Sequence, residues 1–184
     1  MRFILIKNVA EYKDTITEVV MSLVGANIKS ETRDNHLIIY HRYDNLDELE
    51  EVLLALETGL MFSVHAYNSY DREEPKLKKE LNIALKLIDS LPNGVYDLKS
   101  ALLANNKISY PNEVLEFILD RSDINQDFIK DFVECDLNVS KASKVMLIHR
   151  NTMNYKLDKL KEVSDFDLRK FKDAYILYSL INDK

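Results

Sequence analysis

A short segment, residues 149–159, concentrates side chains that can form hydrogen bonds with a nucleic acid. Arg150 can hold the O6 and N7 atoms of a guanine with two hydrogen bonds, and Asn151 and Asn154 can do the same for an adenine. Lys, Thr and other small polar side chains instead suit phosphate oxygens, which set a protein's register on a duplex. We therefore expect base contacts from Arg150, Asn151 and Asn154, and phosphate contacts from Ser140, Lys141, Lys144, Thr152, Tyr155, Lys156 and Lys159.

Two short helices joined by a tight turn would position these side chains. Asn138 and Ser140 are both favourable N-cap residues, so the first helix can begin at either. Its inward face is predicted to hold Ala142, Val145 and Met146. The second helix begins near His149, whose side chain serves as a cap, as a packing group or as a phosphate contact. Its apolar stripe, with spacings of four, three and three, consists of Met153, Leu157, Leu160 and Val163.

This arrangement is typical of a helix-turn-helix, whose second helix enters the major groove and reads base edges from its N-terminal end. The local charge agrees with this interpretation. Residues 140–172 contain nine Lys and Arg and four Asp and Glu, a net charge of +5, in a chain of net charge −6, which leaves −11 for the remainder. A basic segment on an acidic protein is what phosphate binding requires. A solvated basic surface helix without a nucleic-acid partner fits the pattern equally well.

A longer stretch, LNVSKASKVMLIHRNTMNYKLDKL, resembles the C-terminal helix-turn-helix of the PucR/CdaR family of bacterial transcriptional regulators. The resemblance extends from about residue 127 to residue 181. It implies a cytoplasmic bacterial regulator that binds double-stranded DNA. The matching positions are Asn138, Val139, Ser140, Ala142, Ile148, His149, Arg150, Asn151, Thr152, Tyr155 and Leu157.

Three positions depart from the family pattern. Asn154 and Lys156 stand where the family often has Arg, and Met153 stands where it has Leu. The first two changes remove guanidinium groups, which form bidentate hydrogen bonds that amide and ammonium groups do not reproduce.

The composition argues against most nucleotide-dependent enzymes. The only glycines are Gly25, Gly59 and Gly94, so no glycine-rich phosphate loop exists. The lone Cys135 is expected to be a buried small residue, which suits a reducing cytoplasm. No apolar run approaches 18 residues and MRFILIKN is no signal peptide, so neither a membrane span nor secretion is expected. His36, His41 and His65 could meet in a metal site only by accident of fold, and no catalytic triad is apparent. We expect no enzyme activity, no cofactor and no metal.

Residues 1–70 alternate between strand and helix patterns. Strands are predicted at 3–6, 26–31, 36–42 and 61–67, and helices at 16–23 and from Asn45 onward. The order is β-α-β-β-α-β, which is the ferredoxin-like pattern in an α+β fold. Many PucR/CdaR relatives carry a degenerate GGDEF-like domain before the DNA-binding domain, and the resemblance implies a small version here. Because no GGDEF or GGEEF sequence is present, cyclase chemistry is rejected.

The polar DREEP sequence at 71–75 marks one predicted boundary, and the start of the helix-turn-helix domain at residue 126 marks a second. The three predicted ranges are a small α+β domain (1–70), connecting helices (71–125) and the helix-turn-helix domain (126–184). Connecting helices are expected at 77–91, 95–104 and 111–119. The first of them is either a core helix of the small domain or a dimer contact. A homodimer on two half-sites is expected, and a small-molecule effector is left open. The alternative function is a dimeric protein-interaction scaffold without specific DNA binding.

Overall fold

The computed structural model describes residues 1–7, 9–25, 28–43, 46–60, 63–70, 73–105 and 110–182. Contacts within the chain divide it into two compact units, Met1–Asn106 and Lys107–Lys184. The first unit combines helices with a five-stranded sheet, and the described part of the second unit is helical. The predicted α+β class is confirmed.

The sheet of the first unit has the strand order β2-β3-β1-β4-β5. β1 pairs with β3 and β4, and β3 pairs with β2, all antiparallel, whereas β5 runs parallel to β4. β2 therefore forms one edge of the sheet. The bounds of the strands are β1 (Arg2–Ile6), β2 (Lys29–Arg33), β3 (His36–His41), β4 (His65–Asn68) and β5 (Gly94–Tyr96).

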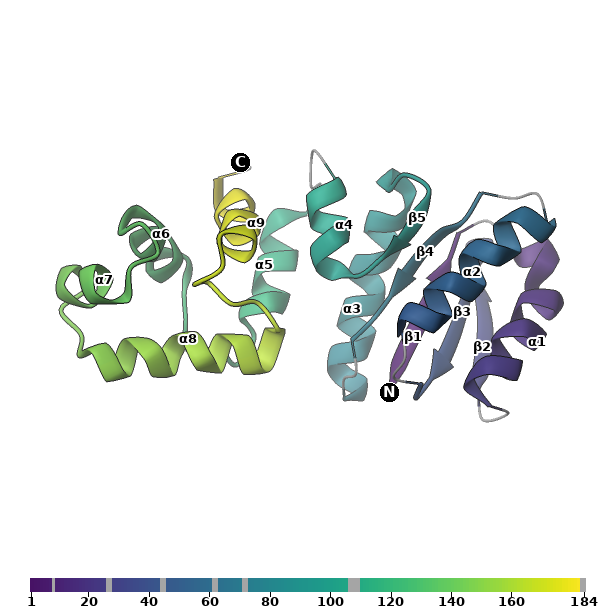
Figure 1. The fold of residues 1–184 in the computed structure, drawn as a ribbon, viewed down its shortest axis with the longest axis horizontal. Coiled ribbons are helices and arrows are strands. Elements are labelled where there is room, and N and C mark those ends of the chain that lie inside the picture. Colours follow the sequence, from purple (N-terminus) through teal and green to yellow (C-terminus); the bar gives the residue numbers. More distant parts are fainter. Residues whose placement is uncertain are drawn as a thin grey trace. The chain divides into compact units, whose positions relative to one another are not determined.

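The central strand β1 of this sheet is buried on both faces. Ile4 and Ile6 pack in one core with residues of α1 (Lys13–Val24) and α2 (Leu46–Leu60). The alternate β1 residues Phe3 and Leu5 are equally buried on the opposite face, where α3 (Glu74–Leu87) contacts β1. Figure 1 shows α1 and α2 on one side of the sheet and α3 on the other. The apolar spacing at 77–91 thus builds a core helix, which favours the first of its two interpretations.

Two chain reversals show local causes. Gly25 ends α1 at a φ of +90°, where its N–H donates to the carbonyl of Met21. The helix predicted at 95–104 is wrong at its start, because residues 94–96 form β5. Asp97 then caps α4 (Leu98–Ala104), accepting a 2.7 Å bond from the Ser100 N–H while its own N–H donates to Ser100 Oγ at 2.9 Å.

Several predicted features fall outside the described residues or shift within them. The strands predicted at 26–31 and 61–67 are seen as β2 and β4, which begin three and four residues later. The proposed cap residue Asn45 and the start of the DREEP sequence lie outside the described residues.

The compact units do not follow the three predicted ranges. α3, β5 and α4 pack on the sheet of the first unit. In the second unit, α5 (Pro111–Leu119) packs with α8 (Arg150–Ser164) and α9 (Phe171–Asn182). The connecting helices therefore form no compact body of their own. The division into 1–70, 71–125 and 126–184 stays a prediction about function, since compactness alone assigns no role to a segment.

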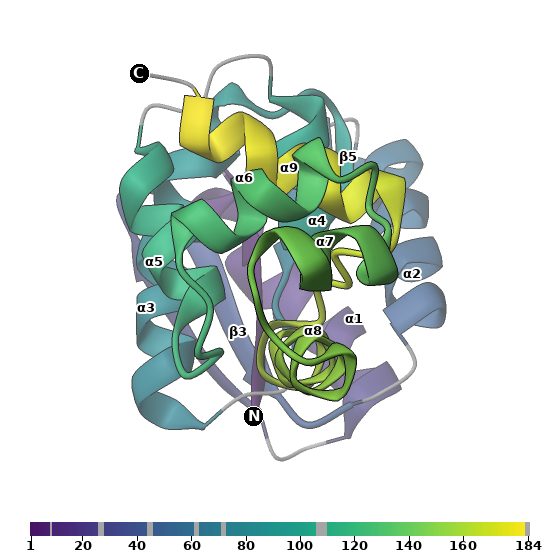
Figure 2. The same ribbon diagram turned by 90° about the vertical axis from the view of Figure 1, so that its left-hand side faces the viewer.

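The second unit is a bundle in which α9 has a central place. α5 and α6 both contact α9, and α8 contacts α5 and α7 (Figure 2). Ala174, Leu177 and Ile181 of α9 are buried, so this unit covers most of its own apolar terminal helix. Beyond α5, its helices are α6 (Gln126–Glu134), α7 (Val139–Val145), α8 (Arg150–Ser164) and α9 (Phe171–Asn182).

Candidate nucleic-acid interface

The first helix of the predicted pair, α7, begins at Asn138. The Asn138 side-chain oxygen accepts hydrogen bonds from the backbone N–H groups of Ser140 and Lys141, both at 3.0 Å. Of the two predicted N-caps, Asn138 is therefore the one used. Its side chain satisfies two of the N–H groups that a helix leaves unpaired at its start.

The inward face of α7 differs from the prediction at one position. Ala142 is buried as expected, but Val145 is 60% exposed and Ser143 lies inward instead. Ala142, Ser143 and Met146 fall within about a quarter of the helical circumference, whereas Val145 lies beyond it. The turn then passes through Leu147, which has a φ of +54° and is 91% exposed. The pair of helices and the turn between them are therefore built without a glycine.

The second helix, α8, is capped by His149. The Nδ1 atom of His149 accepts a 3.2 Å hydrogen bond from the Asn151 N–H, which is the cap role among the alternatives for this residue. Met153, Leu157 and Leu160 are fully buried, as predicted. The next inward position is Ser164, while the predicted Val163 is only half-buried.

The buried stripe of α8 leaves the start of the helix open to solvent. Arg150, Asn151 and Thr152 are exposed, and Asn154 is half-buried. One turn further on, Tyr155 is 60% exposed. Figure 2 views α8 nearly along its axis, with α7 beside it. The first two turns of α8 thus present hydrogen-bonding side chains in the way that a major groove can accept.

The positive charges of this region divide into two groups. Within the described segments, no ion pair joins Lys144 or Arg150 to a carboxylate, and both side chains are exposed. The Lys141 ammonium, in contrast, lies 2.8 Å from Asp136, whose carboxylate raises the pKa of Lys141 by hydrogen bonding and by charge. Lys144 and Arg150 can therefore contact a phosphate without first breaking an ion pair.

A second carboxylate, Asp123, lies between α5 and α6 and reaches α8. Its side chain forms an ion pair with Lys159, and its backbone carbonyl accepts a 2.6 Å hydrogen bond from Lys156. The Lys156 ammonium also stands 6.0 Å from the ring centre of Phe128. The hydrogen bond and the positive charge of Lys159 lower the pKa of Asp123. Two predicted phosphate contacts, Lys156 and Lys159, are thus engaged within the domain.

The later turns of α8 carry acidic side chains. Asp158 pairs with Arg169 at 2.8 Å, and Arg169 also contacts Asp167 at 2.8 Å. Burial raises the pKa of the Asp167 carboxyl, whereas hydrogen bonds from Arg169 and its positive charge lower it. The net result is a lowered pKa. Part of the positive charge counted in 140–172 therefore holds α8 to the connection before α9. Among the described residues, the exposed cation of α8 that forms no ion pair is Arg150, in the first turn.

The remaining candidates from the sequence are the histidines, as metal ligands, and the single cysteine. Among the described residues, no group of three His, Cys, Asp or Glu side chains is placed to hold a metal ion. Cys135 is buried, as predicted. His65 lies elsewhere, with Nδ1 3.1 Å from the Leu91 carbonyl oxygen. In the described part of the chain, no helix is both long and apolar enough to cross a membrane.

The comparison with known families decides what this bundle is. Residues 127–181, which run from α6 to α9, match the PucR C-terminal helix-turn-helix domain. These residues form a PucR-type helix-turn-helix domain. The resemblance found in the sequence is confirmed, and the matched residues include α7 and α8.

Two curated relatives from Bacillus subtilis (strain 168) are similar to the chain. The DNA-binding transcriptional activator AdeR is 36% identical over 50 residues, which are 27% of this chain and 12% of AdeR. The uncharacterized protein YxkF is 27% identical over 145 residues, which are 72% of this chain and 49% of YxkF. The matched residues thus cover less than half the length of either relative.

A solved structure also resembles the whole chain. It is the crystal structure of a regulator of polyketide synthase expression from Bifidobacterium adolescentis, with a TM-score of 0.45 and 16% sequence identity. The match covers 100% of this chain and 78% of that chain.

Proposed function

We propose that this protein is a DNA-binding transcriptional regulator of the bacterial cytoplasm, without enzymatic activity, and that α8 enters the major groove. One observation carries the proposal: Arg150, Asn151 and Thr152 are exposed at the start of a helix whose opposite face is buried. The match to a PucR-type domain and the similarity to the activator AdeR support it.

The side chains divide by the role that their surroundings allow. Arg150 and Asn151 contact base edges, and the half-buried Asn154 adds a third base contact from the next turn. The phosphate contacts that require no rearrangement are Ser140, Lys144, Thr152 and Tyr155. The remaining proposed phosphate contacts must first exchange an internal partner: Lys141, Lys156 and Lys159.

A homodimer follows from the size of a single module. One such DNA-binding module buries about 600–1,000 Å² of protein surface, which is small for specific binding. Two copies on half-sites one helical turn apart, about 34–36 Å between centres, double the contacts.

The first unit is proposed to be a ferredoxin-like domain related to degenerate GGDEF-like domains. The strand order β2-β3-β1-β4, antiparallel throughout, supports this, as does the placement of α1 and α2 together on one face. The proposed role is structural or regulatory rather than catalytic.

The proposed function is tested by fluorescence anisotropy with a labelled duplex from upstream of the protein's own gene. Wild type should bind with an affinity that falls steeply as salt rises, because bound phosphates release counterions. Arg150→Ala should weaken binding by about 5- to 150-fold, the range for losing one bidentate base contact. Arg42→Ala, which removes an exposed guanidinium from the first unit, is the matched control and should bind like wild type.

The alternative is a dimeric interaction scaffold, and one observation favours it. Phe171 and Tyr175 of α9 are 77% and 56% exposed and stack with ring centres 6.3 Å apart. Exposed aromatic pairs are common at protein–protein contacts. A wild-type protein that fails to bind the duplex even at low salt would refute the DNA-binding function and leave this alternative. Equal binding by wild type and Arg150→Ala would refute the proposed reading helix.

A further inference from the structure

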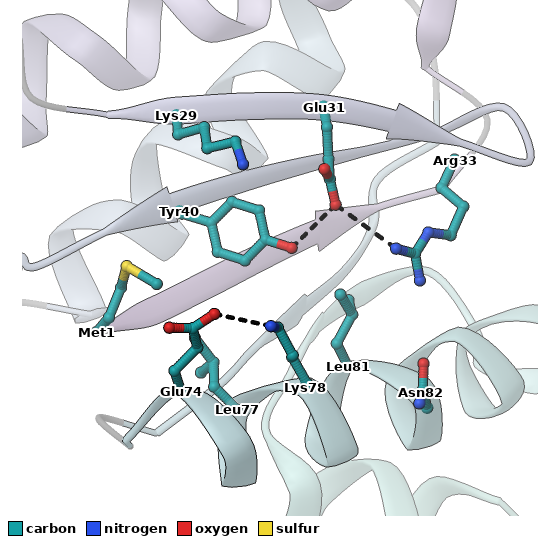
Figure 3. A pocket seen from close by; sticks show the side chains of 10 residues that line it. All are labelled: Met1, Lys29, Glu31, Arg33, Tyr40, Glu74, Leu77, Lys78, Leu81 and Asn82. Carbon is teal, nitrogen blue, oxygen red and sulfur yellow. Dashed lines mark hydrogen bonds and ion pairs between the residues drawn. The ribbon is translucent and has the colours of Figure 1, made fainter.

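A cavity of about 410 Å³ opens in the first unit between the β2–β3 edge of the sheet and the first half of α3 (Figure 3). α3 packs on the central strand β1, so the outer part of this face is not covered by a helix. Ligand pockets in proteins measure about 300–1,000 Å³. The cavity therefore has room for one small molecule, but not for a dinucleotide-sized one.

Charged side chains reach this cavity from two sides. Lys29, Glu31 and Arg33 alternate along β2, so their side chains leave the same face of the strand. Glu74 and Lys78 come from α3 on the opposite side, as Figure 3 shows. Among the lining side chains, three cations and two carboxylates give a net charge of +1, opposite in sign to the −6 of the whole chain.

Both carboxylates of the lining are already bonded within the cavity wall. Glu31 accepts a 2.9 Å hydrogen bond from the Tyr40 hydroxyl and lies 3.8 Å from Arg33. Glu74 lies 2.7 Å from the Lys78 ammonium. Each carboxylate already pairs with a cation of the cavity wall, so its charge is largely neutralised for a ligand ammonium group, which argues against a zwitterion.

The cations of β2, Lys29 and Arg33, make few contacts within the cavity wall. The Lys29 ammonium lies 5.9 Å from the centre of the Tyr40 ring. Its charge contributes to lowering the pKa of Glu74, but among the described residues no carboxylate lies within ion-pair distance of it. The single 3.8 Å contact of Arg33 with Glu31 leaves most of the five guanidinium donors available. These two groups can hold the carboxylate of a ligand.

Apolar groups complete the cavity. The half-buried Tyr40 ring faces it from β3, and the buried side chains of Leu77 and Leu81 face it from α3. Burial and the hydrogen bond to Glu31 raise the pKa of Tyr40 to about 12, so its hydroxyl remains protonated at neutral pH. A flat apolar body fits against the Tyr40 ring, where stacking adds to the area buried.

We propose that this cavity binds a small aromatic monocarboxylate, with its carboxylate on Lys29 and Arg33 and its ring against Tyr40, Leu77 and Leu81. The lining side chains include more cations than carboxylates, which suits an anionic ligand. The site lies within the first unit, so the proposal does not depend on DNA binding by α8.

The test is a titration of the full chain with 2-naphthoate, followed by two-dimensional amide NMR. Saturable shifts should be confined to amides of β2, β3 and residues 74–82 of α3. The uncharged 2-naphthamide, which has the same ring system, should bind at least about tenfold more weakly. No saturable shifts up to the solubility limit, shifts centred elsewhere, or equal binding of the amide would each overturn the proposal.

Substitutions locate the anion site. Lys29→Met and Arg33→Met should each weaken 2-naphthoate binding by about threefold to tenfold, the range for one charge-assisted contact at a partly exposed site. Lys79→Met is the matched control, because Lys79 is exposed on α3 and does not line the cavity. Tyr40→Leu, which keeps an apolar side chain but removes the ring, should weaken binding while the remaining amide signals keep their positions. Wild-type affinity in both Lys29→Met and Arg33→Met would refute the assignment.

Discussion

Replacing Asp123 by Asn should strengthen the binding of DNA. The Asp123 carboxylate forms an ion pair with Lys159, which would otherwise be available to a phosphate. Asn is nearly the same size and readily adopts the φ of +59° found at this position, so the loop should keep its shape. The substitution therefore removes a competing anion and leaves the fold of the domain in place.

The size of the effect follows from which contacts Asp123 makes. Lys156 donates to the backbone carbonyl of Asp123, and that bond survives the substitution. One cation is freed, not two. Each neutralised phosphate contributes about −0.9 to the slope of log affinity against log salt, so the slope should become more negative by up to about 0.9, the value reached when Asp123 holds Lys159 away from the DNA in wild type. Over a fourfold change in salt concentration, this amounts to about a 3.5-fold additional change in affinity.

The assay is the salt-dependent anisotropy titration with wild type, Asp123→Asn and two controls. Asp34→Asn changes the charge equally at another exposed residue of positive φ, in the first unit, and should leave the slope unchanged. Asp123→Asn combined with Lys159→Met should return to the wild-type slope, because the freed cation is then absent. If Asp123→Asn leaves both slope and affinity unchanged, Lys159 contacts no phosphate and its pair with Asp123 is purely architectural.

Three further predictions concern stability. Leu157→Ala should destabilise the second unit by about 2–5 kcal/mol, because it empties a fully buried site, and amide hydrogen exchange across α6–α9 should accelerate; exchange as slow as in wild type would contradict this. Leu147→Gly should raise stability by up to about 1 kcal/mol in urea unfolding, since it relieves a φ of +54° and removes a side chain that is 91% exposed; a loss of stability would mean that this side chain packs after all. Burial and the hydrogen bond to Glu31 raise the pKa of Tyr40 from 10.0 to about 12. The contribution of the protonated Tyr40 hydroxyl to the free energy of unfolding should therefore be complete below pH 10 and be lost as the pH rises through about 12. Tyr40→Phe should lose that part of the alkaline dependence in urea unfolding, and an unchanged profile would count against the assignment.

Features set by neighbouring residues were predictable from the sequence. The helix predicted at 111–119 is α5, which begins at Pro111 as a proline-started helix should. The buried stripe Met153, Leu157 and Leu160 follows from helical spacing alone. Asn138 was recognisable as a cap because its role is local.

Features set by distant residues were not predictable in the same way. The backbone of Asp123 bonds a lysine 33 positions away, and no periodicity in the sequence connects the two. β5 has only three residues and exists because it can pair with β4, so residues 94–96 carry too short a pattern to distinguish strand from helix. Val145 has the same apolar side chain whether it faces inward or outward, and only the packing of α7 decides between the two.

The composition of β2 has a consequence for how the protein behaves at high concentration. As the outermost strand on its side of the sheet, β2 has backbone N–H and C=O groups along one side that no strand of this sheet pairs. Such an edge can recruit a strand from another molecule and begin aggregation. Here the strand reads KSETR, and a second copy laid against it would bring ammonium, carboxylate and guanidinium groups into close contact without an apolar face to bury. The side chains that line the cavity therefore also protect the sheet from intermolecular strand addition, and replacing several of them with apolar residues would remove that protection.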